Sequence, residues 1–247
     1  MDKWKYHDIA CRDHRIINPI SATKLDEMIE VLKLAPSARV LDIACGKAEM
    51  LARLAARYAI QGTGIDLSPY FAAAAAETVR ARVHTPSAVD IICADGRDFV
   101  AETPFDLAMC IGASWVYGGH VGTLTALKSF VRPGGLVLVG EPFWRCKPPA
   151  EYLAAIEQRE DSFLTHAGNV AAGESVGVTP LYSVVSSPDD WDRYEWLRVQ
   201  ALERYAQANP DDPDGTEMIR QGRLTRDGFL RWGRDVLGWA VYLYLKP

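Results

Sequence analysis

The sequence lacks any hydrophobic run long enough to cross a bilayer. Lysine, arginine and aspartate side chains interrupt the apolar residues from Met1 to Asn18, so this stretch does not resemble the core of a signal peptide. We therefore expect a cytoplasmic protein with no membrane partner.

A surplus of positive charge is also missing. The chain has 27 Lys and Arg against 32 Asp and Glu, and its net charge is −5. Proteins that bind nucleic acids normally carry a basic surface, so this balance disfavours a nucleic-acid partner.

The five cysteines form no CxxC pair, and their odd number disfavours a disulfide framework or a zinc cluster. Cys93 and Cys110 lie in apolar, strand-like segments and are expected to be small core residues. The five histidines have no i, i+4 spacing that would suit a metal on a helix. The sequence therefore predicts no metal site.

Short apolar segments alternate with helical patterns over the first 140 residues. Such an alternation predicts an α/β fold with a doubly wound, mostly parallel sheet that is covered on both faces. The predicted strands are 40–43, 62–67, 88–93, 105–111 and 136–140, and the predicted helices are 47–58, 69–83 and 121–131.

The remaining elements lie at the two ends of the chain. A helix follows Pro19, with Ser21 or Thr23 as its cap, and Pro36 ends it. The pattern after Pro142 predicts helices at 148–158, 163–176, 189–208 and 214–236, and strands at 181–185 and 239–245. We expect a single domain, 1–247, divided into an N-terminal cover (1–36), a core (37–146), a helical lid region with the sixth strand (147–236) and a last strand (237–247).

The strongest functional signal follows the first predicted strand. Asp42 lies in that strand, and the small residues Ala44, Cys45 and Gly46 form a tight turn that leads into a helix. Small side chains allow the backbone to approach a ligand, and a helix N-terminus offers free N–H groups. This turn is a candidate ligand-binding loop.

The next two strands also end in acidic residues. Asp66 follows Asp42 by 66 − 42 = 24 residues, and in a doubly wound sheet an acid at this place accepts hydrogen bonds from ribose hydroxyls. Leu67 would then lie against an adenine face. Asp95 and Gly96 follow the third strand, where the carboxylate can accept a bond from the adenine amino group and the backbone can bond a ring nitrogen. Asp95 could instead be a helix cap.

These pieces, followed by a Pro-Gly-Gly turn at 133–135, resemble the class I methyltransferases that use S-adenosylmethionine (SAM). The resemblance covers about 37–142 and implies a seven-stranded sheet with an antiparallel last strand. It implies SAM as cofactor and S-adenosylhomocysteine (SAH) as product. The implied cofactor contacts are Asp42, Ala44, Cys45 and Gly46 at the methionine half, Asp66 at the ribose, Leu67, Asp95 and Gly96 at the adenine, and Ile111 and Gly112 beside the methyl group.

A closer resemblance lies at the edges of this core. The segments 14–19, 112–115, 140–144, 191–195 and 208–212 are similar to a group of bacterial methyltransferases related to the ubiquinone/menaquinone C-methyltransferase type. That group has no common acceptor, so the resemblance does not name one.

One departure from the family pattern concerns the first turn. The family usually has glycine at three alternating positions, which here hold Ala44, Gly46 and Ala48. Alanine disfavours positive φ. Either the affinity for SAM is lower, or the loop uses backbone angles that alanine tolerates.

Methyl transfer from a sulfonium is an in-line displacement, so alignment is the main contribution of the enzyme. A base is needed only where the acceptor must lose a proton. The candidate bases are His14, Tyr117, His120 and Glu141. Three of them have a structural alternative: His14 could bond the backbone at a helix entry, His120 could cap a helix, and Glu141 could brace a loop.

The aromatic residues of the C-terminal third could roof a pocket, which predicts a small-molecule acceptor. Two alternatives remain open: a non-catalytic SAM-binding protein, which the two alanines favour, and a Rossmann-type NAD(P) oxidoreductase, which would prefer G-x-G-x-x-G at the first turn. Residues 112–115 lack the Asn/Asp-Pro-Pro-aromatic turn of DNA amino-methyltransferases. The sequence leaves the oligomeric state open.

Overall fold

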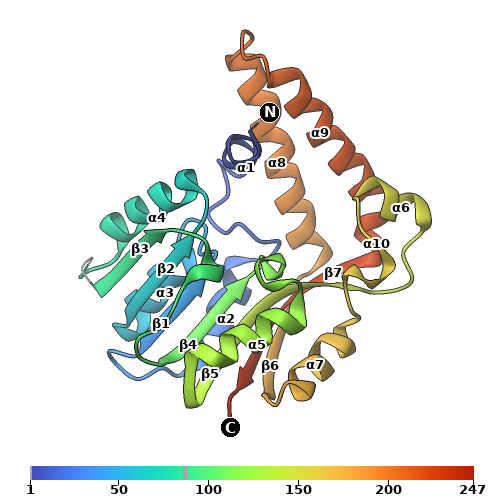
Figure 1. Cartoon of the computed structure of the whole chain (residues 1–247). Coiled ribbons are helices and arrows are strands. Elements are labelled where there is room, and N and C mark those ends of the chain that lie inside the picture. Colours follow the sequence, from blue (N-terminus) through green and yellow to red (C-terminus); the bar gives the residue numbers. More distant parts are fainter. Residues whose placement is uncertain (1, 86–87) are drawn as a thin grey trace.

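The computed structural model describes residues 2–85 and 88–247, and a seven-stranded sheet lies at its centre (Figure 1). The strand order is β3-β2-β1-β4-β5-β7-β6, and β7 runs antiparallel to both of its neighbours. This arrangement confirms the predicted fold class. The strands are β1 Arg39–Ile43, β2 Gln61–Asp66, β3 Val89–Cys93, β4 Phe105–Ile111, β5 Val131–Trp144, β6 Thr179–Val185 and β7 Leu237–Leu245.

Helices cover both faces of the sheet because successive strand residues point to opposite sides. Val40 of β1 belongs to a cluster with residues of α2, α3 and α4, whereas Leu41 belongs to a cluster with residues of α5 and α7. The two clusters are the two halves of the core. The covering helices are α2 Ala22–Leu32, α3 Glu49–Tyr58, α4 Pro69–Arg82, α5 His120–Phe130 and α7 His166–Ser175.

Serine side chains cap the N-termini of two of these helices, as the sequence indicates. Ser21 accepts a hydrogen bond from the N–H of Lys24 at α2, and Ser68 accepts one from Phe71 at α4. Each bond satisfies an N–H group that the first helical turn leaves free. α2 ends at Leu32, one turn before Pro36.

The C-terminal third differs from the prediction mainly in the lengths of its elements. The helix expected at 148–158 is the shorter α6, Ala150–Ala155, and α7 begins only at His166, after a short 3₁₀ turn at Glu160–Ser162. The helix expected at 214–236 is α9, Gly215–Gly228, followed by a π-helical turn, Phe229–Gly233, and α10, Arg234–Val236.

Two predictions were wrong because they depended on tertiary contacts. β5 extends to Trp144, well beyond 136–140, because its second half pairs with β7 as far as Leu237. Cys93 is exposed, not buried, because β3 is an edge strand, whereas Cys110 in the centre of the sheet is buried as expected.

A group of helices projects beyond the sheet, although part of it packs into the core (Figure 1). α8, Pro188–Ala208, and α9 form a hairpin, and α1, Lys3–Ala10, packs against α8. Ile9, Leu202 and Met218 share a small cluster that holds the three helices together. The sequence did not predict α1, because its apolar residues acquire a partner only in the folded chain. None of the described helices is long and apolar enough to span a membrane.

The turn after β1 has an unusual backbone. Ala44, Gly46 and Ala48 all have left-handed angles, with φ of 57°, 56° and 56°. The loop therefore does not use angles that alanine tolerates, and each alanine costs roughly 1–2 kcal/mol. A side chain at Gly46 would also come within 3.1 Å of Ile17.

We expect Ala44→Gly to stabilise the protein. Removal of the left-handed strain exceeds the entropy cost of glycine, so the free energy of unfolding rises by about 0.5 kcal/mol and Tm by about 1–2 °C. Ala52→Gly, in the middle of α3, is the control and should lower stability by about 1 kcal/mol or more. Equal losses in both variants, measured by urea unfolding, would contradict the assignment of strain.

Candidate functional site

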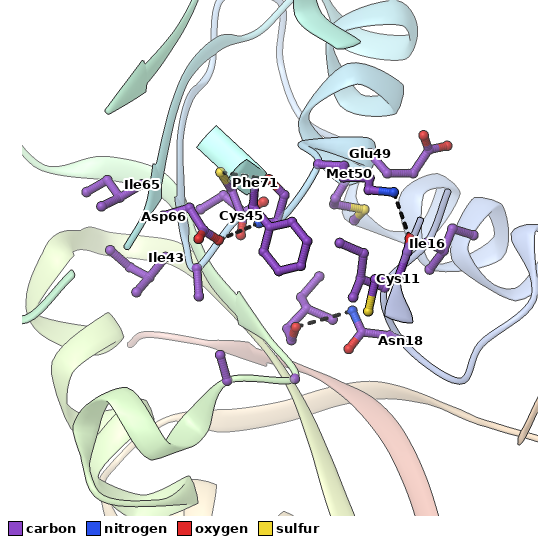
Figure 2. Close-up of a pocket in the computed structure, with 18 of the residues that line it drawn as sticks. Cys11, Ile16, Asn18, Ile43, Cys45, Glu49, Met50, Ile65, Asp66 and Phe71 are labelled. Carbon is purple, nitrogen blue, oxygen red and sulfur yellow. Dashed lines mark hydrogen bonds between the residues drawn. The ribbon is translucent and has the colours of Figure 1, made fainter. Parts of the chain in front are cut away.

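A cavity of about 240 Å³ opens at the carboxyl ends of the central strands (Figure 2). The ends of β1, β2 and β4 and the turn after β3 contribute to its wall. All ten residues that the resemblance assigns to the cofactor line this single cavity: Asp42, Ala44, Cys45, Gly46, Asp66, Leu67, Asp95, Gly96, Ile111 and Gly112.

The Asp66 carboxylate links the turn after β1 to the turn after β2. Its carboxylate accepts one hydrogen bond from the N–H of Gly46 and another from the N–H of Ser68, each at 2.9 Å. Burial raises the pKa of Asp66, and these two bonds oppose the rise. A carboxylate has about four acceptor positions, so Asp66 retains capacity for hydroxyl groups of a ligand.

Asp42 lies beside Asp66 and is 3% exposed. Burial, and then the charge of Asp66, raise the pKa of Asp42 well above its ordinary value. None of the ion pairs in the described part of the chain neutralises Asp42. A cation in the cavity would relieve the repulsion between the two carboxyl groups.

Asp95 is engaged within its own turn. Both carboxylate oxygens accept hydrogen bonds from the Arg97 guanidinium, and Oδ1 also accepts one from the backbone N–H of Arg97. These bonds lower the pKa of Asp95 to about 2. Asp95 therefore caps the short helix Gly96–Asp98, as the structural alternative predicted, and also lines the cavity.

The N-terminal cover provides most of the opposite wall, which the sequence patterns did not predict. Figure 2 shows Cys11, Ile16 and Asn18 across the cavity from Ile43 and Asp66. The similarity of segment 14–19 to the family was the one signal that could have placed this wall. The other lining residues that were missed include Trp4, His7, Arg15, Ile17, Ile20, Leu25, Lys47, Glu49, Met50, Phe71, Trp115, Val116 and Tyr194.

Lys47 fastens the cover to the turn after β1. Its ammonium donates hydrogen bonds to the backbone carbonyls of Cys11 (2.7 Å), Arg12 (3.0 Å) and His14 (3.0 Å). These bonds use all three donors of the ammonium group and satisfy carbonyls at the end of α1. The cover is therefore attached to the loop that borders the cavity.

Two further hydrogen bonds attach the cover to the core. Asn18 donates from Nδ2 to the carbonyl of Ile111 at 3.2 Å, directly beside Gly112. Arg15 donates from Nε to the buried Glu49 at 3.0 Å. The cover thus contacts both turns that border the methionine and methyl positions implied by the resemblance.

The four candidate bases do not line this cavity. His14 bonds the carbonyl of Tyr194 at 2.9 Å, and burial lowers its pKa to about 4. His120 bonds the carbonyl of Asn169 at 3.1 Å, and burial lowers its pKa to about 4 as well. Both imidazoles are neutral at neutral pH.

Tyr117 and Glu141 lie behind the cavity wall. The Tyr117 hydroxyl donates to the carbonyl of Gly96 at 2.8 Å, and burial raises its pKa to about 12. Glu141 is 2% exposed, and burial raises its pKa to about 7. Among the described residues, no group of three or more His, Cys, Asp and Glu side chains could hold a metal ion.

Comparison with known proteins agrees with this geometry. Residues 40–135 match the family model for a methyltransferase domain. YjhP of Escherichia coli K12, described as uncharacterized, is 34% identical over 245 residues, which are 98% of this chain and 98% of that protein.

Two solved structures are similar over nearly the whole chain. A SAM-dependent methyltransferase from Geobacter sulfurreducens in complex with SAH is 33% identical, covers 98% of both chains and has a TM-score of 0.93. One from Thiobacillus denitrificans, also in complex with SAH, is 34% identical, covers 100% of both chains and has a TM-score of 0.92. The chain therefore belongs to the class I SAM-dependent methyltransferases.

Proposed function

We propose that the protein binds SAM in this cavity and transfers its methyl group to a small molecule, with SAH as product. The observation that carries the proposal is the convergence of all ten cofactor-pattern residues on one cavity. The family members from Geobacter and Thiobacillus were solved with SAH, which supports the same cofactor here.

The chemistry of the lining fits the parts of SAM. Asp66 has acceptor capacity for the ribose hydroxyls, and Leu67 offers an apolar surface for the adenine. Asp42, a buried carboxyl without a cation, suits the positive methionine half. SAM supplies an activated methyl group with a neutral leaving group, and the protein supplies alignment.

A second cavity, also about 240 Å³, supports the small-molecule acceptor. Arg15, Asn18 and Tyr194 line both cavities, so the two cavities adjoin each other at these residues. Within the single domain we propose, the cover (1–36) and the lid region (147–236) line this space next to the cofactor-binding core (37–146). A concave space of this size suits a small molecule, and the net charge of −5 disfavours nucleic acid.

Of the four candidate bases, we retain His14. It lines the second cavity, and its Nδ1 is buried without a hydrogen-bond partner. Because Nε2 faces the carbonyl of Tyr194, the proton resides on Nε2 and Nδ1 keeps a lone pair. A neutral imidazole with a free lone pair can accept a proton from an acceptor hydroxyl or amine.

A non-catalytic SAM-binding protein is the second candidate, which the left-handed alanines of the first turn favour. It would bind SAM and SAH but methylate no member of a broad panel of small molecules.

Asp66→Asn tests the cofactor assignment. The amide cannot accept hydrogen bonds as a charged carboxylate does, and its NH₂ group faces backbone N–H donors. We expect affinity for both SAM and SAH to fall at least tenfold in calorimetric titrations, and we expect no binding of NAD. Asp90→Asn, on the exposed side of β3, should leave binding unchanged. Binding of NAD, or of neither SAM nor SAH by the unmodified chain, would overturn the proposal.

Arg15→Gln tests the orientation of the cofactor. The Arg15 side chain is 63% exposed at the cavity, and we infer that its guanidinium pairs with the methionine carboxylate. Affinity for SAH should fall about tenfold, whereas affinity for methylthioadenosine, which lacks that carboxylate, should stay unchanged. Arg80→Gln on α4 is the control. Equal losses for both ligands would indicate a general disturbance and reject the pairing.

A further inference from the structure

Glu141 is a buried carboxyl group behind the wall of the cofactor cavity. It follows Gly140, whose carbonyl accepts a hydrogen bond from the N–H of Gly112 at 2.9 Å. Gly112 lines the cavity, so a single backbone link separates the strand that carries Glu141 from the cavity wall. The side chain is 2% exposed, and Oε2 has no hydrogen-bond partner.

The side chains that surround Glu141 on its own face of the sheet include polar groups that are uncharged. Cross-strand pairing of Glu141 with Ala240 makes Tyr242 its diagonal neighbour on the same face of the sheet. The ionisable groups of this layer are Cys110 from β4, Tyr242 and Tyr244 from β7, His120 from α5 and His166 from α7. Burial keeps the thiol and phenols protonated and the imidazoles neutral, so none of the described side chains of this layer supplies a cation that neutralises the carboxylate.

Two observations connect Glu141 to the cavity. The Ser114 side chain lies close enough to lower the pKa of Glu141, and Ser114 is the first residue of the short helix Ser114–Tyr117, whose next two residues, Trp115 and Val116, line the cavity. The charges of Asp42 and Glu141 both raise the pKa of Cys110, and Asp42 lines the cavity. The charge on Glu141 therefore acts across the same low-dielectric region as the cavity carboxyls.

SAM and SAH differ in one charge. SAM carries a positive sulfonium, whereas the sulfur of SAH is neutral; the rest of the two molecules carries the same charges. This inference rests on the proposed function. We propose that Glu141 discriminates between substrate and product by charge: its ionised carboxylate strengthens binding of SAM but not of SAH, and so favours replacement of the product by a new molecule of SAM.

The proposal has a definite pH signature. Burial raises the pKa of Glu141 to about 7, so the group is largely protonated at pH 6 and largely ionised at pH 8. A bound sulfonium lowers that pKa, and SAM binding near pH 7 therefore releases part of a proton. Two unit charges on the order of 10 Å apart at an effective dielectric constant of about 20 interact by an amount equivalent to roughly tenfold in affinity.

The test is calorimetric titration of the whole chain with SAM and with SAH at pH 6, 7 and 8, in buffers of low and high ionisation enthalpy. The preference for SAM over SAH should rise about fivefold from pH 6 to pH 8, because Glu141 is neither fully protonated nor fully ionised at the ends of this range, and more protons should be released by SAM than by SAH. Glu141→Gln, which keeps the shape and loses the charge, should abolish both effects. Comparing the two ligands cancels contributions from the ammonium and carboxylate groups that they share.

Two further variants separate Glu141 from other groups. Glu195→Gln removes another buried glutamate, on α8, whose pKa is also raised by burial, and it should leave the pH dependence intact. Ser114→Ala removes the hydroxyl group that lowers the pKa of Glu141, so it should move the change in preference to higher pH. If Glu141→Gln does not fold, infrared difference spectra of the unmodified protein and of Ser114→Ala decide: SAM but not SAH should remove a protonated carboxyl signal, and that signal should persist to higher pH in Ser114→Ala. A signal that does not shift in Ser114→Ala belongs to Asp42 and overturns the role of Glu141.

The outcomes are distinct. If neither ligand binds, the proposed function itself is wrong. If both bind and their affinity ratio does not change with pH, or changes equally in Glu141→Gln, the role of Glu141 is overturned while the proposed function stands. A pH-dependent ratio that persists in Glu141→Gln would instead assign the effect to Asp42 or Asp66.

Discussion

Buried negative charge at the carboxyl edge of the sheet is the constraint on which the rest of the site depends. Asp42 and Asp66 lie close enough to raise the pKa of Asp42, and burial raises the pKa of both. Such an arrangement destabilises the empty protein unless a cation or hydrogen-bond donors compensate. The chain supplies backbone N–H groups to Asp66, whereas none of the ion pairs among the described residues includes Asp42, so positive charge on a ligand would compensate this carboxyl group.

That constraint explains the geometry of the turn after β1. The N–H of Gly46 points at Asp66 because the turn is left-handed at three alternating positions, and two of them hold alanine. Contacts with the cover stabilise this strained backbone: Lys47 donates hydrogen bonds to three carbonyls of the cover, and Ile17 lies next to Gly46. The cover therefore has two functions, since it closes the cavity and stabilises the turn that positions Asp66.

The sequence predicted the sheet and the cofactor side of the cavity because both depend on local patterns. A strand, a small-residue turn and an acid at a fixed spacing determine where Asp42, Asp66 and Asp95 lie, and all three line the cavity. The other wall could not be predicted in this way. α1 gains its apolar partners only from α8 and α9, and Arg15 and Asn18 reach the cavity through contacts with residues 34 and 93 positions away. The candidate bases show the same limit, because residue type alone does not reveal that His120 and Glu141 face the layer behind the sheet.

The position of Glu141 behind the cavity wall, and not in it, determines what its carboxyl group can do. A group that cannot reach the acceptor cannot remove its proton, but a charge in a low-dielectric interior acts without contact. Methyl transfer removes one positive charge from the cofactor. Under the proposal for Glu141, the carboxyl groups that line and back the site would stabilise the charged sulfonium of SAM, and this stabilisation would be absent for the neutral sulfur of SAH.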